Sequence, residues 1–153
     1  MAAPSDVNKR KHMFSEDMKF LQKAVVFHPD GTHFLTLKRT PNDPRRPNCW
    51  DLPGGNVAFG EKHDVAILRE ISEETSLKVD GLRPIQVVTN FQDDIYYLFV
   101  GYTCVAQTSD VEISSEHSEY RWITTKEFLS LESADFLVDL IKKIGVNTVS
   151  LGC

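Results

Sequence analysis

Alternating and β-branched apolar positions predict strands along most of the chain. Segments 21–27 (LQKAVVF) and 34–38 (FLTLK) flank the turn sequence His28-Pro29-Asp30-Gly31. Proline presets φ and glycine accepts a positive φ in such a turn, so we expect a β-hairpin. Further strands are expected at 50–52, 84–91, 95–105 and 120–123, with residues 92–94 closing a second hairpin.

Two segments carry apolar side chains at helical spacing. The first, 63–75, is expected to turn one stripe of residues toward the core: Val65, Leu68, Ile71 and Ser72. The second, 134–144, is expected to follow an N-cap at Ser133 and to end at Gly145. Its expected apolar face consists of Phe136, Leu137, Leu140, Ile141 and Ile144.

The linking segments complete the expected fold. Residues 40–49 (TPNDPRRPNC) hold three prolines and are expected to form a loop, and Thr124 with Glu127 makes a capping box for a short helix. The elements indicate the α+β class, as an α/β/α sandwich in which helices flank a mixed β-sheet. We expect a mobile polar arm at residues 1–17 and a single domain over 18–153.

Composition and charge narrow the class of protein. With 153 residues, 41% hydrophobic and 25% charged, the chain is unlike disordered, collagen-like or coiled-coil sequences. A net charge of −5 argues against DNA binding by bulk attraction, and no apolar stretch is long enough to suggest a membrane. The odd, widely spaced Cys49, Cys104 and Cys153 predict reduced thiols, and residues 1–11 precede no apolar signal region, so we expect a cytoplasmic protein.

Three glutamates on the first expected helix carry the most informative chemistry. Glu70, Glu73 and Glu74 stand at i, i+3 and i+4 and share one helix face, which the helical wheel places opposite the expected core stripe. A hard divalent cation such as Mg²⁺, which prefers oxygen ligands, would compensate their repulsion. Because acidic helix faces are common without a ligand, a solvated surface is the alternative.

The surrounding residues favour a ligand. Arg69 can orient the carboxylates, and Gly54-Gly55 offers backbone that a ligand can approach closely. The segment resembles the signature of the Nudix hydrolases (MutT-like proteins), with eight of nine fixed positions matched: Gly55, Glu61, Arg69, Glu70, Ile71, Glu73, Glu74 and Leu77. The likeness extends over about residues 20–145. The last signature glycine is Ser76 here, which would cost on the order of 1 kcal/mol in a left-handed conformation.

The resemblance implies both activity and site. Family members hydrolyse a nucleoside diphosphate linked to another group, so we expect a metal-dependent pyrophosphohydrolase with a small-molecule nucleotide substrate of the nucleoside triphosphate or dinucleoside polyphosphate type. Mg²⁺, or Mn²⁺ in its place, would be held by Glu70, Glu73, Glu74 and the Gly55 carbonyl. Arg69 would anchor the glutamates, and Glu70 is a candidate general base. Homodimers are common in the family, so a homodimer is an open expectation.

A later segment, 115–122 (SEHSEYRW), resembles the Glu-His-x-x-Tyr-x-Trp motif of the dinucleoside-polyphosphate and dihydroneopterin-triphosphate branches of the family. That likeness implies a metal-ligand or base role for Glu116, with Glu119 as a weaker candidate. The alternative is a polar loop that simply precedes a strand.

Substrate-binding residues are less defined by the sequence. A local basic cluster could meet the outer phosphates, although such side chains on a proline-rich loop are often only solvated: Lys38, Arg39, Arg45 and Arg46. Tyr97 and Phe99 share one face of their strand, which we assign to the core, and no base-stacking aromatic can be chosen.

Two other functions stay open. A catalytically silent Nudix-fold regulator that binds a nucleotide is one, although such domains typically lose glutamates that this chain keeps. The processing of RNA 5′ ends is disfavoured because no extended basic face with interleaved aromatics is visible.

Overall fold

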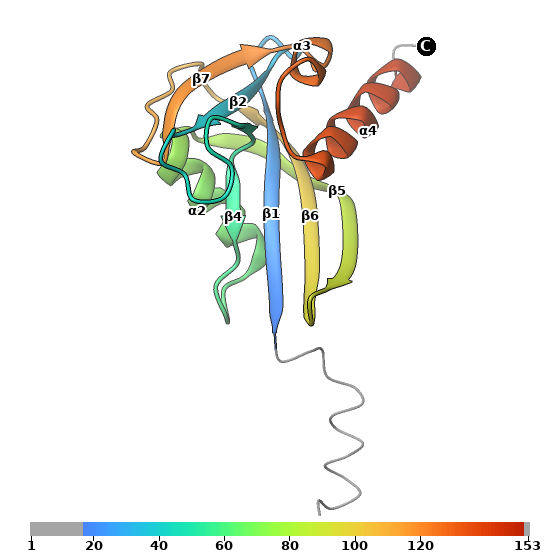
Figure 1. Cartoon of the computed structure of the whole chain (residues 1–153). Helices are drawn as coiled ribbons and strands as arrows, with labels where there is room; N and C mark the ends of the chain where they lie inside the picture. Colours follow the sequence, from blue (N-terminus) through green and yellow to red (C-terminus); the bar gives the residue numbers. More distant parts are fainter. Residues whose placement is uncertain (1–16, 152–153) are drawn as a thin grey trace, which may run out of the picture.

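The computed structural model describes residues 17–151, with side chains as far as residue 145 (Figure 1). The predicted arm, except Asp17, and Cys153 lie outside the described residues. The strands are β1 (Met18–Phe27), β2 (Phe34–Arg39), β3 (Trp50–Asp51), β4 (Gly54–Asn56), β5 (Val79–Gln92), β6 (Ile95–Ala106) and β7 (His117–Ile123). The helices are α2 (His63–Thr75), α3 (Thr125–Leu129) and α4 (Asp135–Leu151).

The strands form one mixed, seven-stranded sheet. Its main order is β3-β2-β1-β6-β5, while β4 pairs with β1 and β7 pairs with β2. The predicted hairpin of β1 and β2 is confirmed only at its turn, where Phe27 faces Phe34, because β1 pairs along its whole length with the parallel strand β6. The second hairpin is confirmed, since Gln92 faces Ile95 across β5 and β6.

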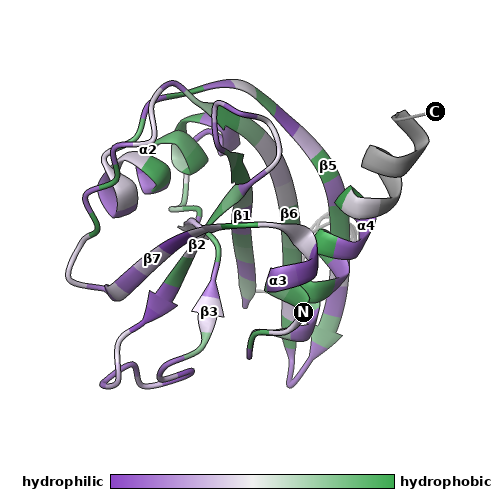
Figure 2. Cartoon of the chain, turned by 90° about the horizontal axis from the view of Figure 1, so that it is seen from above, coloured by the Kyte–Doolittle hydropathy of each residue, from purple (hydrophilic) through white to green (hydrophobic). Residues whose placement is uncertain are grey.

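Side chains alternate across the sheet and build two cores, one on each face. Ala24 and Val26 of β1 pack into the core under α2, together with Ile67 and Ile71. Val25 belongs to the opposite core, which α3 and α4 cover with Phe128, Leu137, Leu140 and Ile141. Seen from above, β1 and β6 lie between α2 and α4, and β7 is largely hydrophilic (Figure 2). The α/β/α sandwich is therefore confirmed.

Helix α2 has the predicted bounds but a different buried face. Val65 and Leu68 are 53% and 41% exposed and Ser72 is exposed, so of the expected stripe only Ile71 lies in the core. The buried residues are instead Ala66, Ile67, Ile71, Glu74 and Thr75. The prediction assumed that all three carboxylates face solvent, whereas Glu74 lies beside Ile67 and Ile71 on the wheel and turns inward with them.

Helix α4 confirms the predicted apolar face, with Phe136 half-buried and the other four residues buried. The predicted end at Gly145 is wrong, because the helix continues to Leu151. An interior glycine costs only about 1 kcal/mol, less than a buried helix face contributes. The Ser133 N-cap is also wrong: its hydroxyl has no hydrogen-bond partner among the described residues, and Ser133 pairs its backbone with Trp50.

The capping box of Thr124 and Glu127 is confirmed at the start of α3. Within residues 17–151, no helix is long and apolar enough to cross a bilayer.

Candidate active site

The end of α2 brings two glutamates against the glycines of β4. Glu74 is 3% exposed, and its Oε1 accepts a hydrogen bond from the Gly54 N–H at 3.1 Å. A Cβ at Gly55 would lie 2.8 Å from the Glu70 Cδ, and Gly54 has a φ of 148° and no room beside the Gln22 carbonyl. The signature glycine is thus required because the Glu70 carboxylate occupies the space where a side chain would be.

Arg69 holds the other carboxylates of the signature. Its guanidinium binds Glu61 with two hydrogen bonds, from Nε at 2.8 Å and from Nη2 at 3.1 Å. Its Nη1 contacts Glu70 at 3.1 Å and Glu73 at 3.2 Å. The hydrogen bond from Arg69 lowers the pKa of Glu61. Glu61, just ahead of the helix, therefore fixes the arginine that orients Glu70 and Glu73.

Burial gives Glu74 unusual electrostatics. Removal from solvent raises the pKa of its carboxyl to about 8, against the lowering effects of Lys23 and of the Gly54 N–H. Asp51 and Glu70 add further negative charge and raise this pKa as well. A cation in front of Glu74 would favour the charged form. The arrangement of this carboxylate is therefore suited to a positively charged ligand.

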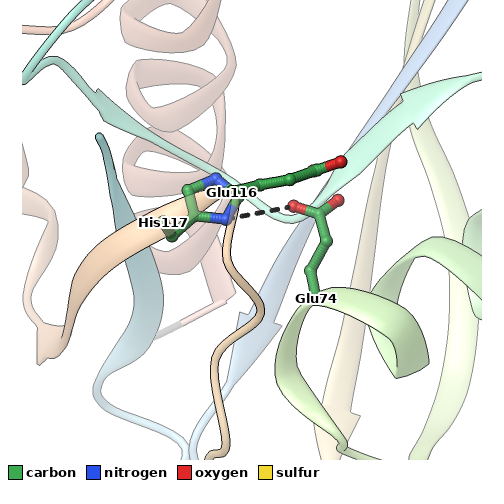
Figure 3. A group of neighbouring side chains, drawn as sticks. All are labelled: Glu74, Glu116 and His117. Atoms are coloured by element: carbon green, nitrogen blue, oxygen red, sulfur yellow. Dashed lines mark ion pairs between the residues drawn. The ribbon is translucent and has the colours of Figure 1, made fainter. Parts of the chain in front are cut away.

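The start of β7 approaches the same carboxylate (Figure 3). His117 is 8% exposed, and its Nδ1 lies 3.7 Å from Glu74 Oε2. One ligand atom from each of Glu74, Glu116 and His117 lies within 4.8 Å of the others. Burial lowers the pKa of His117 to about 4. The hydropathy pattern of the sequence gives His117 no role, although the Glu-His pair of the motif is a signal that could have found it.

Glu116 and Glu119 separate in space. Glu116 lines the cavity at Glu74, whereas Glu119 pairs with Arg121 at 3.1 Å on an exposed part of β7. Only the first of these two candidates lies beside the signature glutamates.

A buried network of opposite charges lies near Glu74. Asp51 binds Lys23 Nζ at 3.0 Å and Arg39 Nη1 at 2.6 Å. Burial opposes the ionisation of Asp51, but the two cations outweigh it and hold its pKa below the usual value. Lys23 was missed in the sequence because it stands within an apolar strand.

The four residues of the predicted basic cluster do not lie together in the structure. Arg39 lines the same cavity as Glu74 and also pairs with Asp43 at 2.8 Å. Lys38 instead lies over the Trp50 ring at 5.8 Å and does not line this cavity. Arg45 lines this cavity and also a second cavity beside it. Arg46 lines only the second cavity, where its guanidinium carbon lies 5.3 Å from the centre of the Phe136 ring.

Two adjacent cavities result, which we call the polar cavity and the aromatic cavity. The polar cavity, about 520 Å³, is lined by Lys23, Arg39, Glu70, Glu74, Glu116 and His117 among others. The aromatic cavity, about 630 Å³, is lined by Val88, Asn90, Tyr97, Phe99 and Phe136 among others. Leu21, Arg45 and Asn56 line both. Phe99 is in the core as predicted, but Tyr97 is half-buried, and both border this cavity.

The protein family of this chain follows from its likeness to known families. The family described as the NUDIX domain matches residues 22–143, which include every residue that lines the polar cavity except Leu21. The chain belongs to the Nudix family of pyrophosphohydrolases.

Relatives and solved structures of other Nudix proteins are consistent with this family. The nucleoside triphosphatase NudI of Salmonella arizonae is 29% identical over 121 residues, covering 70% of this chain and 85% of the relative. The MutT protein of Methanosarcina mazei has a TM-score of 0.72 at 24% identity, covering 89% of this chain and 99% of that one. The C. elegans Ap4A hydrolase has a TM-score of 0.65 at 19% identity, covering 86% and 98%. The structural likenesses show the fold.

The one departure from the Nudix signature has a local explanation. Ser76 ends α2 in the left-handed region, with a φ of 62°, as predicted for the position of the signature glycine. Its hydroxyl donates to the Glu112 carbonyl at 3.3 Å, in the segment that leads to β7. The serine therefore gains a contact that glycine lacks, which offsets part of its conformational cost.

Proposed function

We propose that this Nudix domain hydrolyses a pyrophosphate bond of a nucleoside triphosphate in the presence of a divalent metal ion. The observation that carries the proposal is the junction of the two cavities. A polar cavity lined by carboxylates and cations opens beside an aromatic cavity whose volume of about 630 Å³ is typical of small-molecule sites. A triphosphate in the first and a nucleoside in the second would use both.

The donor set fits a hard divalent metal. Glu70, Glu74 and Glu116 line the polar cavity with carboxylate oxygens, and Gly55 lines it with backbone. Glu73, whose side chain is 59% exposed, contacts Arg69 and does not line the cavity. When bound, such a metal neutralises phosphate oxygens and lowers the pKa of an attacking water. We therefore assign ligand roles to Glu70, Glu74 and Gly55 first and to Glu73 second.

The protein side chains then have distinct tasks. Arg69 donates a hydrogen bond to Glu70 and so orients its carboxylate, which lies against Gly55. Lys23 and Arg39, which Asp51 holds in place, present positive charge to a phosphate chain in the polar cavity. Arg45, which borders both cavities, is placed to contact the phosphate nearest the nucleoside. Glu70 and Glu116 are the candidate bases for the attacking water, since both line the polar cavity.

The experiment is a phosphate- and pyrophosphate-release assay with Mg²⁺ and then Mn²⁺. The panel contains nucleoside triphosphates, dinucleoside polyphosphates, nucleotide sugars and oxidised nucleotides, with Glu74→Gln as the test variant. Glu132→Gln, an equal change at an exposed position outside both cavities, is the matched control. We expect turnover of a nucleoside triphosphate that falls about a thousandfold in Glu74→Gln and is retained in the control. Full activity of Glu74→Gln would overturn the assignment of the site.

A second candidate is nucleotide binding without turnover. It is favoured by the likeness to the NUDIX domain of Shewanella oneidensis NrtR, a structure complexed with ADP ribose, with a TM-score of 0.71 at 20% identity, covering 96% of this chain and 99% of that one. It is opposed by the retained carboxylates of the polar cavity. Calorimetric binding of ADP-ribose, without hydrolysis of any compound in the panel, would favour it over the lead proposal.

Four further expectations stay predictions: the hydrolysis of dinucleoside polyphosphates, a homodimer, the lack of DNA binding and a cytoplasmic location. The solved Ap4A hydrolase supports including dinucleoside polyphosphates in the panel. A homodimer is tested by light scattering of the purified chain, the absence of DNA binding by a fluorescence-anisotropy titration, and a cytoplasmic location by fractionation of cells that express it.

A further inference from the structure

One buried side chain of the polar cavity has no part in the chemistry proposed above. His117 is 8% exposed, and its Nδ1 has no hydrogen-bond partner among the residues that the structure describes. The 3.7 Å to Glu74 Oε2 is too long for a hydrogen bond. A buried ring nitrogen without a partner is unfavourable, because it has lost its hydrogen bonds to water and gained none in exchange. The structure therefore holds a nitrogen that a bound ligand would satisfy.

A β-bulge brings the imidazole to this place. Across β2 and β7, Lys38 faces Glu119 and Arg39 faces His117, so the register shifts by one residue at Ser118. Facing residues share a side of the sheet and successive residues alternate. Without the shift, His117 would lie on the side of Glu119. With it, His117 lies on the side of Arg39 and enters the polar cavity.

The imidazole then completes a set of three donors. Figure 3 shows Glu74 rising from α2 toward His117, with Glu116 beside it at the start of β7. Their ligand atoms lie within 4.8 Å of one another. Ligands at about 2.0–2.2 Å from one ion lie up to about 4.4 Å apart, so small rotations of the exposed Glu116 side chain suffice.

We propose that His117 is a metal ligand of this site, and that its nitrogen, beside the oxygens of Glu74 and Glu116, makes the site prefer Mn²⁺ to Mg²⁺. Mg²⁺ favours an all-oxygen octahedral set, whereas imidazole is a better ligand for first-row transition ions. The inference rests on the proposed metal-dependent function and assigns to one side chain the choice of metal.

The test is the coordination of Mn²⁺ by the full-length, metal-free chain. Pulsed electron paramagnetic resonance detects imidazole nitrogen coupled to bound Mn²⁺, and growth on ¹⁵N-histidine changes that signal only if the nitrogen is histidine. We expect the histidine coupling in the wild type, its loss in His117→Gln, and its retention in His33→Gln. His33 lies in the turn between β1 and β2 and lines neither cavity, so this variant is the matched control.

Affinity supplies a second readout. In His117→Gln we expect the Mn²⁺ dissociation constant to rise on the order of tenfold or more, with a change below about threefold for Mg²⁺. Equal losses for both ions would overturn the preference.

Failure of this inference differs from failure of the proposed function. Mn²⁺ that binds the wild type, is lost in Glu74→Gln and shows no histidine coupling would overturn the role of His117 and leave the hydrolase proposal intact. That wild-type measurement holds even if His117→Gln does not fold. Histidine-coupled Mn²⁺ in a chain that hydrolyses nothing would support the ligand and overturn the proposed function.

Discussion

The polar and aromatic cavities share three lining residues but are assembled in different ways. Most of the residues that line the polar cavity come from one stretch of chain, between Arg39 and Glu74. The aromatic cavity takes Leu21 from β1, Val88 from β5, three residues of β6 and Phe136 from α4. Reaction chemistry is therefore encoded locally in this protein, whereas the space for the rest of the substrate depends on the pairing of distant strands.

The strongest test of this comparison lies within the signature itself. Glu74 is buried against Gly54, whereas Glu73 is exposed and contacts Arg69. We expect Glu74→Gln to lower kcat about a thousandfold, or about 4 kcal/mol in the barrier, and Glu73→Gln to lower it about tenfold. Steady-state kinetics with Mg²⁺ measures both. Equal losses would mean that Glu73 leaves Arg69 and enters the polar cavity when substrate binds.

The cationic wall predicts the next largest effect, on stability. Asp51→Ala leaves Lys23 and Arg39 in the cavity wall without their shared carboxylate. We expect the free energy of unfolding to fall by about 3 kcal/mol in a urea titration, as for other broken buried ion pairs. Glu119→Ala, which breaks an exposed pair with Arg121, is the control and should cost less than about 1 kcal/mol. A small loss for Asp51→Ala would mean that solvent readily replaces the carboxylate.

The same carboxylate gives a pH dependence of stability. The folded-state pKa of Asp51 lies below the unfolded value, so the folded state binds its proton less readily. Its contribution is present above the unfolded pKa of about 4 and is lost as the pH falls through the folded pKa. The difference in unfolding free energy between the wild type and Asp51→Asn should therefore shrink below about pH 4. A difference that grows on acidification would contradict the depressed pKa.

The sequence predicted those features of the fold that depend on residues close together in the chain. The bounds of α2 and the capping box at Thr124 depend on side chains within a few positions, and both are confirmed. The parallel pairing of β1 with β6 joins segments about 80 positions apart, and periodicity carries no information about it.

The buried face of α2 and the placement of His117 could not be predicted from the sequence, for related reasons. Hydropathy alone assigns Glu74 to solvent, and only the burial of its neighbours Ile67 and Ile71 turns it inward. A one-residue bulge decides the side of the sheet on which His117 lies, and nothing in the alternation of β7 predicts it.

The aromatic cavity should respond in a different kinetic parameter. Tyr97 is half-buried and lines that cavity, away from the signature glutamates. We expect Tyr97→Ala to raise KM about tenfold and to change kcat less than about twofold, because the lost contact is made equally in the ground and transition states. Tyr97→Phe is the control and should keep the wild-type KM if the ring supplies the contact. A loss confined to kcat would place Tyr97 in the chemistry instead.

The smallest effect concerns Ser76, where the end of α2 contacts the segment that leads to β7. Backbone hydrogen bonds tie Glu112 to Thr75 and Ser114 to Glu74, so the end of α2 carries the segment that leads to Glu116. Ser76→Gly removes the cost of a side chain at a φ of 62° but also removes the hydroxyl bond to Glu112. We expect a net gain of about 0.5 kcal/mol in unfolding free energy, with kcat within about twofold of the wild type. A fall in kcat at unchanged or higher stability would show instead that the serine positions the approach of β7, and that one wall of the polar cavity depends on the other.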